Sequence, residues 1–193
     1  MPDHDSAKSI FDRKLEEYED QISKNSFETA LLLDRHGNLL FSKKGNNKTV
    51  RFSTKDLNQM FGNVLTHNHP FSQQLELSDP NTSAFSSADL ALAYQQKPKE
   101  IRMVIGNERH SFQWTGATKQ EAQRFLDKLL VIEEGAKAAI EKVDEKMRSG
   151  GYKTTESYYT AYCATARKYF DRINLFFEEH DCIGYRFKRG RRE

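Results

Sequence analysis

The order of apolar and polar residues along the chain predicts an alternation of helices and strands. Residues 6–24 place apolar side chains at helical spacing among charges, which is typical of an amphipathic helix. Apolar runs at 27–34 and 39–42 flank a tetrapeptide that contains Gly37, and this pattern predicts a β-hairpin. A second hairpin is predicted at 101–114, around another turn that contains a glycine.

The stretch between the two hairpins alternates short elements with loops. An alternating segment at 49–52 leads to a short helix expected at 56–61, and the apolar residues 63–66 predict a buried strand. Residues 70–85 are rich in polar side chains and contain a proline, which predicts an exposed loop. A further helix begins at Ser86.

The C-terminal part of the sequence is helical in character. Residues 119–148 and 154–179 have the periodicity of two long helices, and a short basic segment closes the chain. We therefore expect an α/β protein of three parts. These are an N-terminal helix at 1–25, an α/β core at 26–116 and a C-terminal helical extension with a basic tail at 117–193.

Composition narrows the function only slightly. The 30 Lys and Arg residues against 28 Asp and Glu residues leave a formal charge of +2, which is too balanced to indicate a partner by itself. No apolar run approaches the roughly 20 residues that span a membrane. The N-terminus also lacks the apolar stretch of a leader peptide, so we expect a cytoplasmic protein without a membrane partner. Cys163 and Cys182 stand alone, which argues against a disulfide framework or a cysteine zinc site.

The strongest chemical signal is the sequence Thr66-His67-Asn68-His69-Pro70, in which two histidines leave the end of an apolar strand and enter a loop. Both rings can turn toward one point if the chain bends there. Imidazole is the commonest metal ligand among side chains, and a catalytic zinc has three protein ligands and one open position. The motif therefore predicts a zinc site whose third ligand comes from elsewhere in the chain.

Two acidic residues are candidates to complete this site. Asp89 lies in the first turn of the helix that begins at Ser86, so a carboxylate and a hydroxyl share one helix N-terminus. The same Ser-x-x-Asp pattern is also an ordinary helix-capping box, and that alternative stays open. Glu28 stands at the head of the apolar run 30–33, where its carboxylate can overhang a site and act as a general base.

Three motifs thus follow one another along the core: Glu28, His67-x-His69-Pro70 and Ser86-x-x-Asp89. Their order resembles the signature of the JAMM (MPN) metalloprotease family, and the string HNHP is especially similar to its bacterial RadC-like branch. The resemblance covers about residues 26–116. It implies a three-layer α/β/α fold related to that of cytidine deaminase, with peptidase or isopeptidase activity in active members.

The resemblance also implies a role for each of these residues. His67, His69 and Asp89 would hold a zinc ion whose bound water is the nucleophile. Glu28 would be the general base and acid, and Ser86 would stabilise the oxyanion of the tetrahedral intermediate.

One feature departs from the family pattern. Sixteen residues separate His69 from Ser86, whereas the family usually has fewer. The surplus predicts a loop at 70–85 that shapes substrate access. It also leaves a rival third ligand open, because Asp79 lies within this segment, although the helix start favours Asp89.

The sequence therefore predicts a zinc-dependent hydrolase of peptide or isopeptide bonds in a protein substrate, and the resemblance leaves a ubiquitin-like substrate open. The alternative is a RadC-like or phage-associated module that acts in DNA-linked or assembly-linked binding. Its support is the basic segment 186–192, which can contact nucleic acid or remain a solvated tail. The aromatic face of the helix at 154–179 leaves packing against the core or against a second copy of the chain open.

Overall fold

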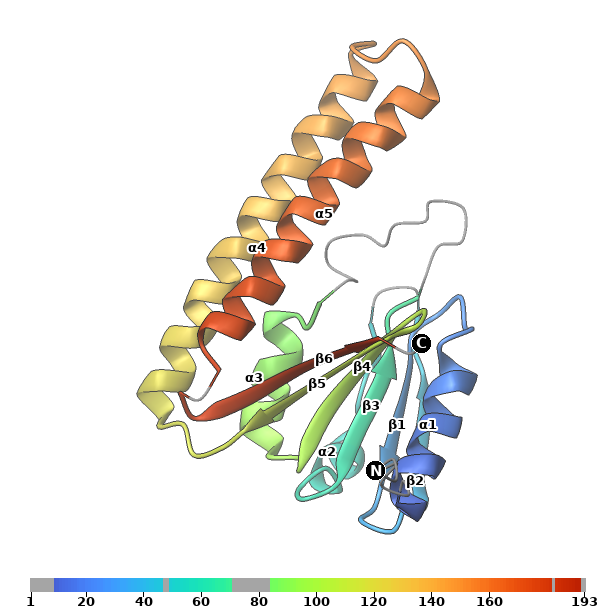
Figure 1. Cartoon of the computed structure of the whole chain (residues 1–193), viewed down its shortest axis with the longest axis vertical. Coiled ribbons are helices and arrows are strands. Elements are labelled where there is room, and N and C mark those ends of the chain that lie inside the picture. Colours follow the sequence, from blue (N-terminus) through green and yellow to red (C-terminus); the bar gives the residue numbers. More distant parts are fainter. Residues whose placement is uncertain (1–8, 47–48, 71–83, 182, 192–193) are drawn as a thin grey trace, which may run out of the picture.

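The computed structural model of the chain describes residues 9–46, 49–70, 84–181 and 183–191. Within these ranges it is a mixed α/β structure of one six-stranded sheet and five helices (Figure 1). The helices are α1 (Ile10–Ile22), α2 (Thr54–Asn58), α3 (Ser87–Gln96), α4 (Lys119–Arg148) and α5 (Thr155–Glu179). The strands are β1 (Thr29–Leu33), β2 (Leu39–Lys44), β3 (Val64–Asn68), β4 (Glu100–Ile105), β5 (Glu108–Trp114) and β6 (Tyr185–Arg191).

The sheet is mixed, with the strand order β2-β1-β3-β4-β5-β6. β3 and β4 are parallel, and all other neighbours are antiparallel. Parallel neighbours need a crossover connection, and α3 lies in the connection between β3 and β4. The N-terminus of α3 lies near the carboxyl end of β3, since Asp89 Oδ1 is 3.6 Å from His67 Nε2.

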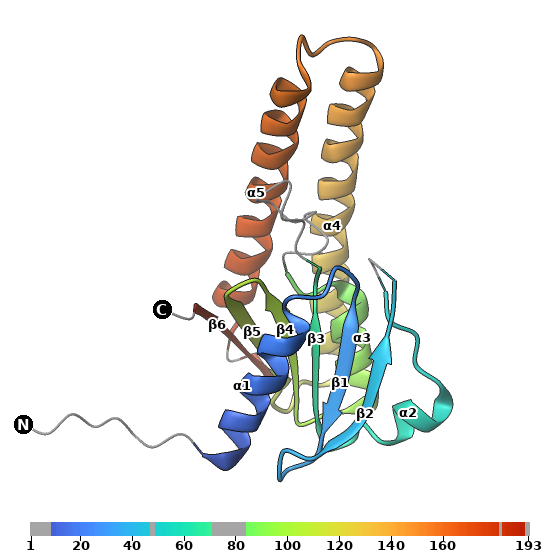
Figure 2. The ribbon, with the colours of Figure 1, turned by 90° about the vertical axis from the view of Figure 1, so that its right-hand side faces the viewer.

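Two hydrophobic clusters pack on the two faces of the sheet. The smaller cluster joins Leu15 and Ile22 of α1 to Leu31, Leu33 and Val64 of β1 and β3. The larger cluster joins the opposite face of the sheet to α3 and to the bases of α4 and α5 (Figure 2). The predicted α/β class, with helices on both faces of a sheet, is therefore confirmed.

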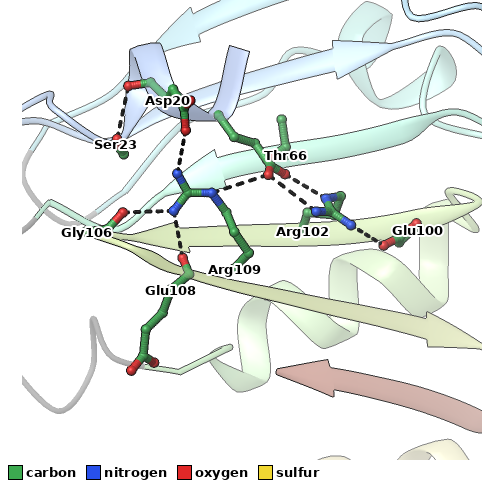
Figure 3. A network of polar contacts seen from close by, with 9 residues as sticks. Asp20, Ser23, Thr66, Glu100, Arg102, Gly106, Glu108 and Arg109 are labelled. Carbon is green, nitrogen blue, oxygen red and sulfur yellow. Dashed lines mark hydrogen bonds and ion pairs between the residues drawn. The ribbon is translucent and has the colours of Figure 1, made fainter. Parts of the chain in front are cut away.

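α1 is tied to its face of the sheet by buried ion pairs as well as by apolar contacts (Figure 3). The carboxylate of Glu19 accepts hydrogen bonds from Arg102 Nε at 2.6 Å and from Thr66 Oγ1 at 3.2 Å. Arg109 Nε lies 3.5 Å from the same carboxylate. Glu19 is fully buried, so its charge is compensated within the chain rather than by water.

α4 and α5 form an antiparallel pair that extends well beyond the sheet (Figure 1). Their buried residues are confined to the end next to the sheet. In α4 they run from Ala122 to Ala136, and in α5 from Ala166 to Phe177. The base of the pair therefore belongs to the protein core, whereas the distal half is largely exposed to solvent.

The basic segment expected as a tail is instead β6, the edge strand that pairs with β5 along its length. Tyr185 and Phe187 are buried in the larger cluster, whereas Arg186 and Lys188 are exposed. This alternation is typical of a strand with one face in a core, so the prediction of a solvated tail is wrong for these residues. Exposed cations are also common on edge strands, where they oppose pairing with other chains.

The described part of the chain contains no helix that is both long and apolar enough to cross a membrane.

Candidate metal centre

Both histidines of the motif point to the same side of the sheet. The sequence predicted that they follow the strand in a loop, but β3 continues through His67 to Asn68, and His69 N donates to Val104 O at 2.9 Å. Alternate residues of a strand face the same side, so no bend is needed to bring the two rings together. Their Nε2 atoms lie 3.1 Å apart, and both side chains are buried.

This separation is informative about what the pair can bind. Two nitrogens that each lie about 2.0 Å from one tetrahedral zinc ion are roughly 3.3 Å apart. The observed 3.1 Å also suits a hydrogen bond from one protonated ring to the other. The spacing of the two rings is therefore compatible with a metal ion between them, or with a hydrogen bond from the N–H of one ring to the nitrogen of the other.

Glu28 immediately precedes β1 and reaches the same point from the neighbouring strand. Its Oε1 lies 3.8 Å from His69 Nε2, and Oε2 is buried without a hydrogen-bond partner among the described residues. Burial, and then the negative charge of Asp89, raise the pKa of Glu28 to about 7. A buried carboxylate oxygen without a partner is costly, so this position favours a bound proton or a cation.

Asp89 approaches the histidines from the first turn of α3. Its Oδ1 lies 3.6 Å from His67 Nε2, and its Oδ2 lies 4.0 Å from His69 Nε2. Burial acts to raise the pKa of Asp89. The charges of the two histidines and the hydrogen bonds from Ser86 outweigh that effect, so the pKa lies below its usual value.

The capping box of Ser86-x-x-Asp89 is observed, and it is compatible with a metal-ligand role for Asp89. Asp89 Oδ2 accepts from Ser86 N at 2.9 Å and from Ser86 Oγ at 2.8 Å, while Asp89 N donates back to Ser86 Oγ. The cap therefore fixes the carboxylate by one oxygen and leaves Oδ1 directed toward His67. A helix cap here orients a side chain of the site.

The structure thus brings together residues that are far apart in the sequence. The candidate ligand atoms of Glu28, His67 and His69 all lie within 4.8 Å of one another, so this buried group could hold a metal ion. Asp89 lies beside the same two rings, so the carboxylates of both Glu28 and Asp89 are close to the histidine nitrogens. Asp79 and most of the expected access loop lie outside the described residues.

The site opens into a cleft of about 540 Å³. One wall is apolar and is formed by Ala30, Val50, Phe52, Leu65 and Leu92. Val50 and Phe52 belong to the segment 49–52, which alternates in sequence but forms no strand. The volume of the cleft lies within the range of about 300–1,000 Å³ that is typical of ligand sites.

α4 supplies another part of the cleft, which the sequence did not indicate. Glu133 accepts from Ser87 N at 2.6 Å and from Ser87 Oγ at 2.7 Å, and Lys137 lines the cleft one turn further along α4. Burial raises the pKa of Glu133, which the hydrogen bonds from Ser87 partly oppose. The contact joins residues 46 positions apart, so no local pattern could have revealed it.

Comparison of the chain with protein-family models, with curated proteins and with solved structures finds no match. The resemblance to JAMM metalloproteases therefore rests on the motif residues alone and stays a prediction.

Proposed function

We propose that the protein is a zinc-dependent hydrolase that cleaves a peptide or isopeptide bond in a protein substrate. The observation that carries the proposal is the meeting of His67, His69 and two carboxylates in one cleft, with Glu28 Oε2 buried and unpartnered. Two imidazoles and a carboxylate are a common ligand set of catalytic zinc. A ubiquitin-like substrate rests on the family resemblance alone.

The donor set favours a transition metal over magnesium or calcium, because those two ions prefer oxygen ligands. Zn²⁺ and Fe²⁺ both bind two histidines and one carboxylate. The second carboxylate favours hydrolysis, since it provides a proton acceptor beside the ion. When bound, zinc would lower the pKa of a coordinated water and polarise the carbonyl of the substrate.

The two carboxylates suit different tasks. Asp89 has a lowered pKa and is held by its cap, so it is the ionised side chain that completes the ligand set with His67 and His69. Glu28, with its pKa near neutral, is suited to take a proton from the attacking water at Oε2 and return it to the leaving amine. A bound cation would draw the pKa of Glu28 down again, which favours its role as the base.

The proposed role of Ser86 requires its hydroxyl to change hydrogen-bond partner. Its hydroxyl donates to Asp89 Oδ2, so it must rotate toward the substrate before it can stabilise an oxyanion. Asp89 Oδ2 keeps the hydrogen bond from Ser86 N during such a rotation. The ligand can therefore stay in place while the hydroxyl changes partner.

The test combines metal analysis with one substitution at Glu28. The full chain, purified without added metal and then loaded with Zn²⁺, is incubated with a proteome-derived peptide pool and with lysine-linked ubiquitin chains, and products are identified by mass spectrometry. We expect one zinc ion per chain and hydrolysis of at least one of these substrates. At saturating Zn²⁺, Glu28→Gln should still hold one ion per chain and lower the rate by about 100-fold or more, because a general base contributes that much.

Glu134→Gln is the matched control, since Glu134 is an exposed glutamate on α4 and should leave the rate unchanged. Full activity of Glu28→Gln would contradict the assigned base. A chain that takes up iron but not zinc would contradict the hydrolase itself.

A further inference from the structure

Asn68 lies between the two histidines and has no part in the chemistry described so far. Its side chain is fully buried and points to the face of the sheet opposite the histidine rings. Its Oδ1 accepts from Thr29 N at 2.7 Å. Its Nδ2 donates to Phe27 O at 3.1 Å and lies 3.4 Å from Asn25 O.

These hydrogen bonds enclose Glu28. The carbonyl of Phe27 belongs to the peptide group before Glu28, and the N–H of Thr29 belongs to the peptide group after it. One carboxamide therefore holds the two peptide planes whose rotation would move the Glu28 side chain. On the opposite side, Glu28 N donates to Asn46 O at 2.7 Å, and Glu28 O accepts from Gly45 N at 2.8 Å.

The Asn68 carboxamide replaces backbone hydrogen bonding at the point where the pairing of β1 with β3 ends. The antiparallel register between β1 and β3 ends at the pair Ala30–His67, and His69 N bonds to Val104 on the β4 side instead. An amide side chain offers an acceptor and a donor on adjacent atoms, as a peptide group does. An aspartate would direct a second acceptor at the Phe27 carbonyl and lose that bond.

The Glu28 carboxylate depends on this support because its own contacts are weak. Oε2 has no hydrogen-bond partner among the described residues, and Oε1 lies 3.8 Å from His69 Nε2. Within the described ranges, no short hydrogen bond holds this side chain beside the rings. Its position must therefore come from the backbone that carries it.

We propose that Asn68 is a positioning residue, which sets the Glu28 carboxylate against the His67–His69 pair through the backbone on both sides of Glu28. This inference rests on the proposed metal site. It gives the central residue of the motif a task that differs from ligation, on the other face of the strand.

The test is a double-mutant cycle between Asn68→Ala and Glu28→Gln in the full chain, with Zn²⁺ alone as the probe. Zinc affinity is measured by competition with a chelator of known affinity. We expect Asn68→Ala to weaken zinc binding about tenfold in the wild-type background, as is typical when groups that orient a metal site are removed. Glu28→Gln should itself weaken zinc binding, because the carboxylate charge beside the ion is lost. In that background Asn68→Ala should change the affinity by less than about twofold.

Asn63→Ala is the matched control. Asn63 stands at the other end of β3 and donates to Gln59 O at 2.7 Å, so the change removes a similar bond away from Glu28. Its zinc affinity should equal that of the wild type. If Asn68→Ala fails to fold, Asn68→Asp provides the second variant. It keeps the acceptor for Thr29 N and loses the donor to Phe27 O, so zinc binding should again weaken less in the Glu28→Gln background than in the wild type.

The outcomes separate the two proposals. An equal loss in both backgrounds, or no loss in either, overturns the positioning role while the metal site stands. A wild-type chain that binds no zinc overturns the proposed function, and the positioning role with it.

Discussion

Two buried glutamates lie on opposite faces of the same sheet and differ in how far the surrounding residues compensate their charge. Glu19, on α1, accepts hydrogen bonds of 2.6 to 3.3 Å from Arg102 and Thr66, and Arg109 Nε lies 3.5 Å from its carboxylate. Glu28, next to β1, has one oxygen without a partner among the described residues. Its closest ion-pair contact is His69, at 3.8 Å.

The difference arises from alternation along β3. Thr66 faces α1 and donates to Glu19, whereas His67 faces the cleft. A buried carboxylate must be compensated by hydrogen bonds and opposite charge, or it takes up a proton. Glu19 is compensated by the chain itself, so it is structural. Glu28 is not, and this difference supports the proposal of a cation site on its face of the sheet.

The largest effect should come from neutralising each glutamate in turn. Glu19→Gln leaves two arginines without their buried counter-charge and should lower the free energy of unfolding by about 3–5 kcal/mol. Glu28→Gln removes an uncompensated charge and should leave the metal-free protein as stable as the wild type or more stable. Denaturant titration at pH 8 with a chelator present measures both. A comparable loss of unfolding free energy in both variants would contradict the difference that we infer between Glu19 and Glu28.

A pH titration of the metal-free protein should give the next largest effect. The pKa of Glu28 is raised from 4.5 to about 7, so the folded state holds its proton more tightly than the unfolded state does. This stabilisation is complete below about pH 4.5 and is lost as the pH rises through about 7. It amounts to about 3 kcal/mol at most, at 1.36 kcal/mol per pH unit.

The comparison with Glu28→Gln isolates this contribution, because the other charged groups that face Glu28, which are His67, His69 and Asp89, are the same in both proteins. The difference in unfolding free energy between wild type and variant should therefore fall between pH 4.5 and 7. A difference that stays constant across this range would show that Glu28 ionises normally.

Much of the fold was predictable because it follows from local periodicity. The two long helices expected at 119–148 and 154–179 are observed at Lys119–Arg148 and Thr155–Glu179. β6 was missed although its alternation is visible in the sequence. Its pairing with β5 depends on a partner about 75 residues away, and such contacts leave no local signal.

The site was predictable in its residue types and not in its supporting contacts. His67, His69, Asp89 and Glu28 are brought together as their motifs suggested. The hydrogen bond between the Asn68 side chain and Thr29 N spans 39 positions, and it requires the register of β1 against β3. Side chains that orient a site act through tertiary geometry, and residue type alone does not reveal them.

The smallest effect is expected from the exposed cations of β6. Unlike Arg102 and Arg109, which pair with Glu19, the side chains of Arg186 and Lys188 are exposed to water. The double substitution Arg186→Glu and Lys188→Glu should change the free energy of unfolding by about 0.5 kcal/mol or less and leave zinc affinity unaltered. Point changes are preferable to a deletion, because removing β6 would expose the buried Tyr185.

The same variant tests the DNA-linked alternative. Two cations neutralise about two phosphates, whereas strong non-specific binders contact about 6–10, so we expect little retention of duplex DNA at 200 mM salt by either protein. If the wild type retains DNA and the variant does not, the basic strand β6 would be the functional surface. In that case the uncompensated Glu28 would still mark a metal site, but the site would serve DNA-linked binding rather than hydrolysis.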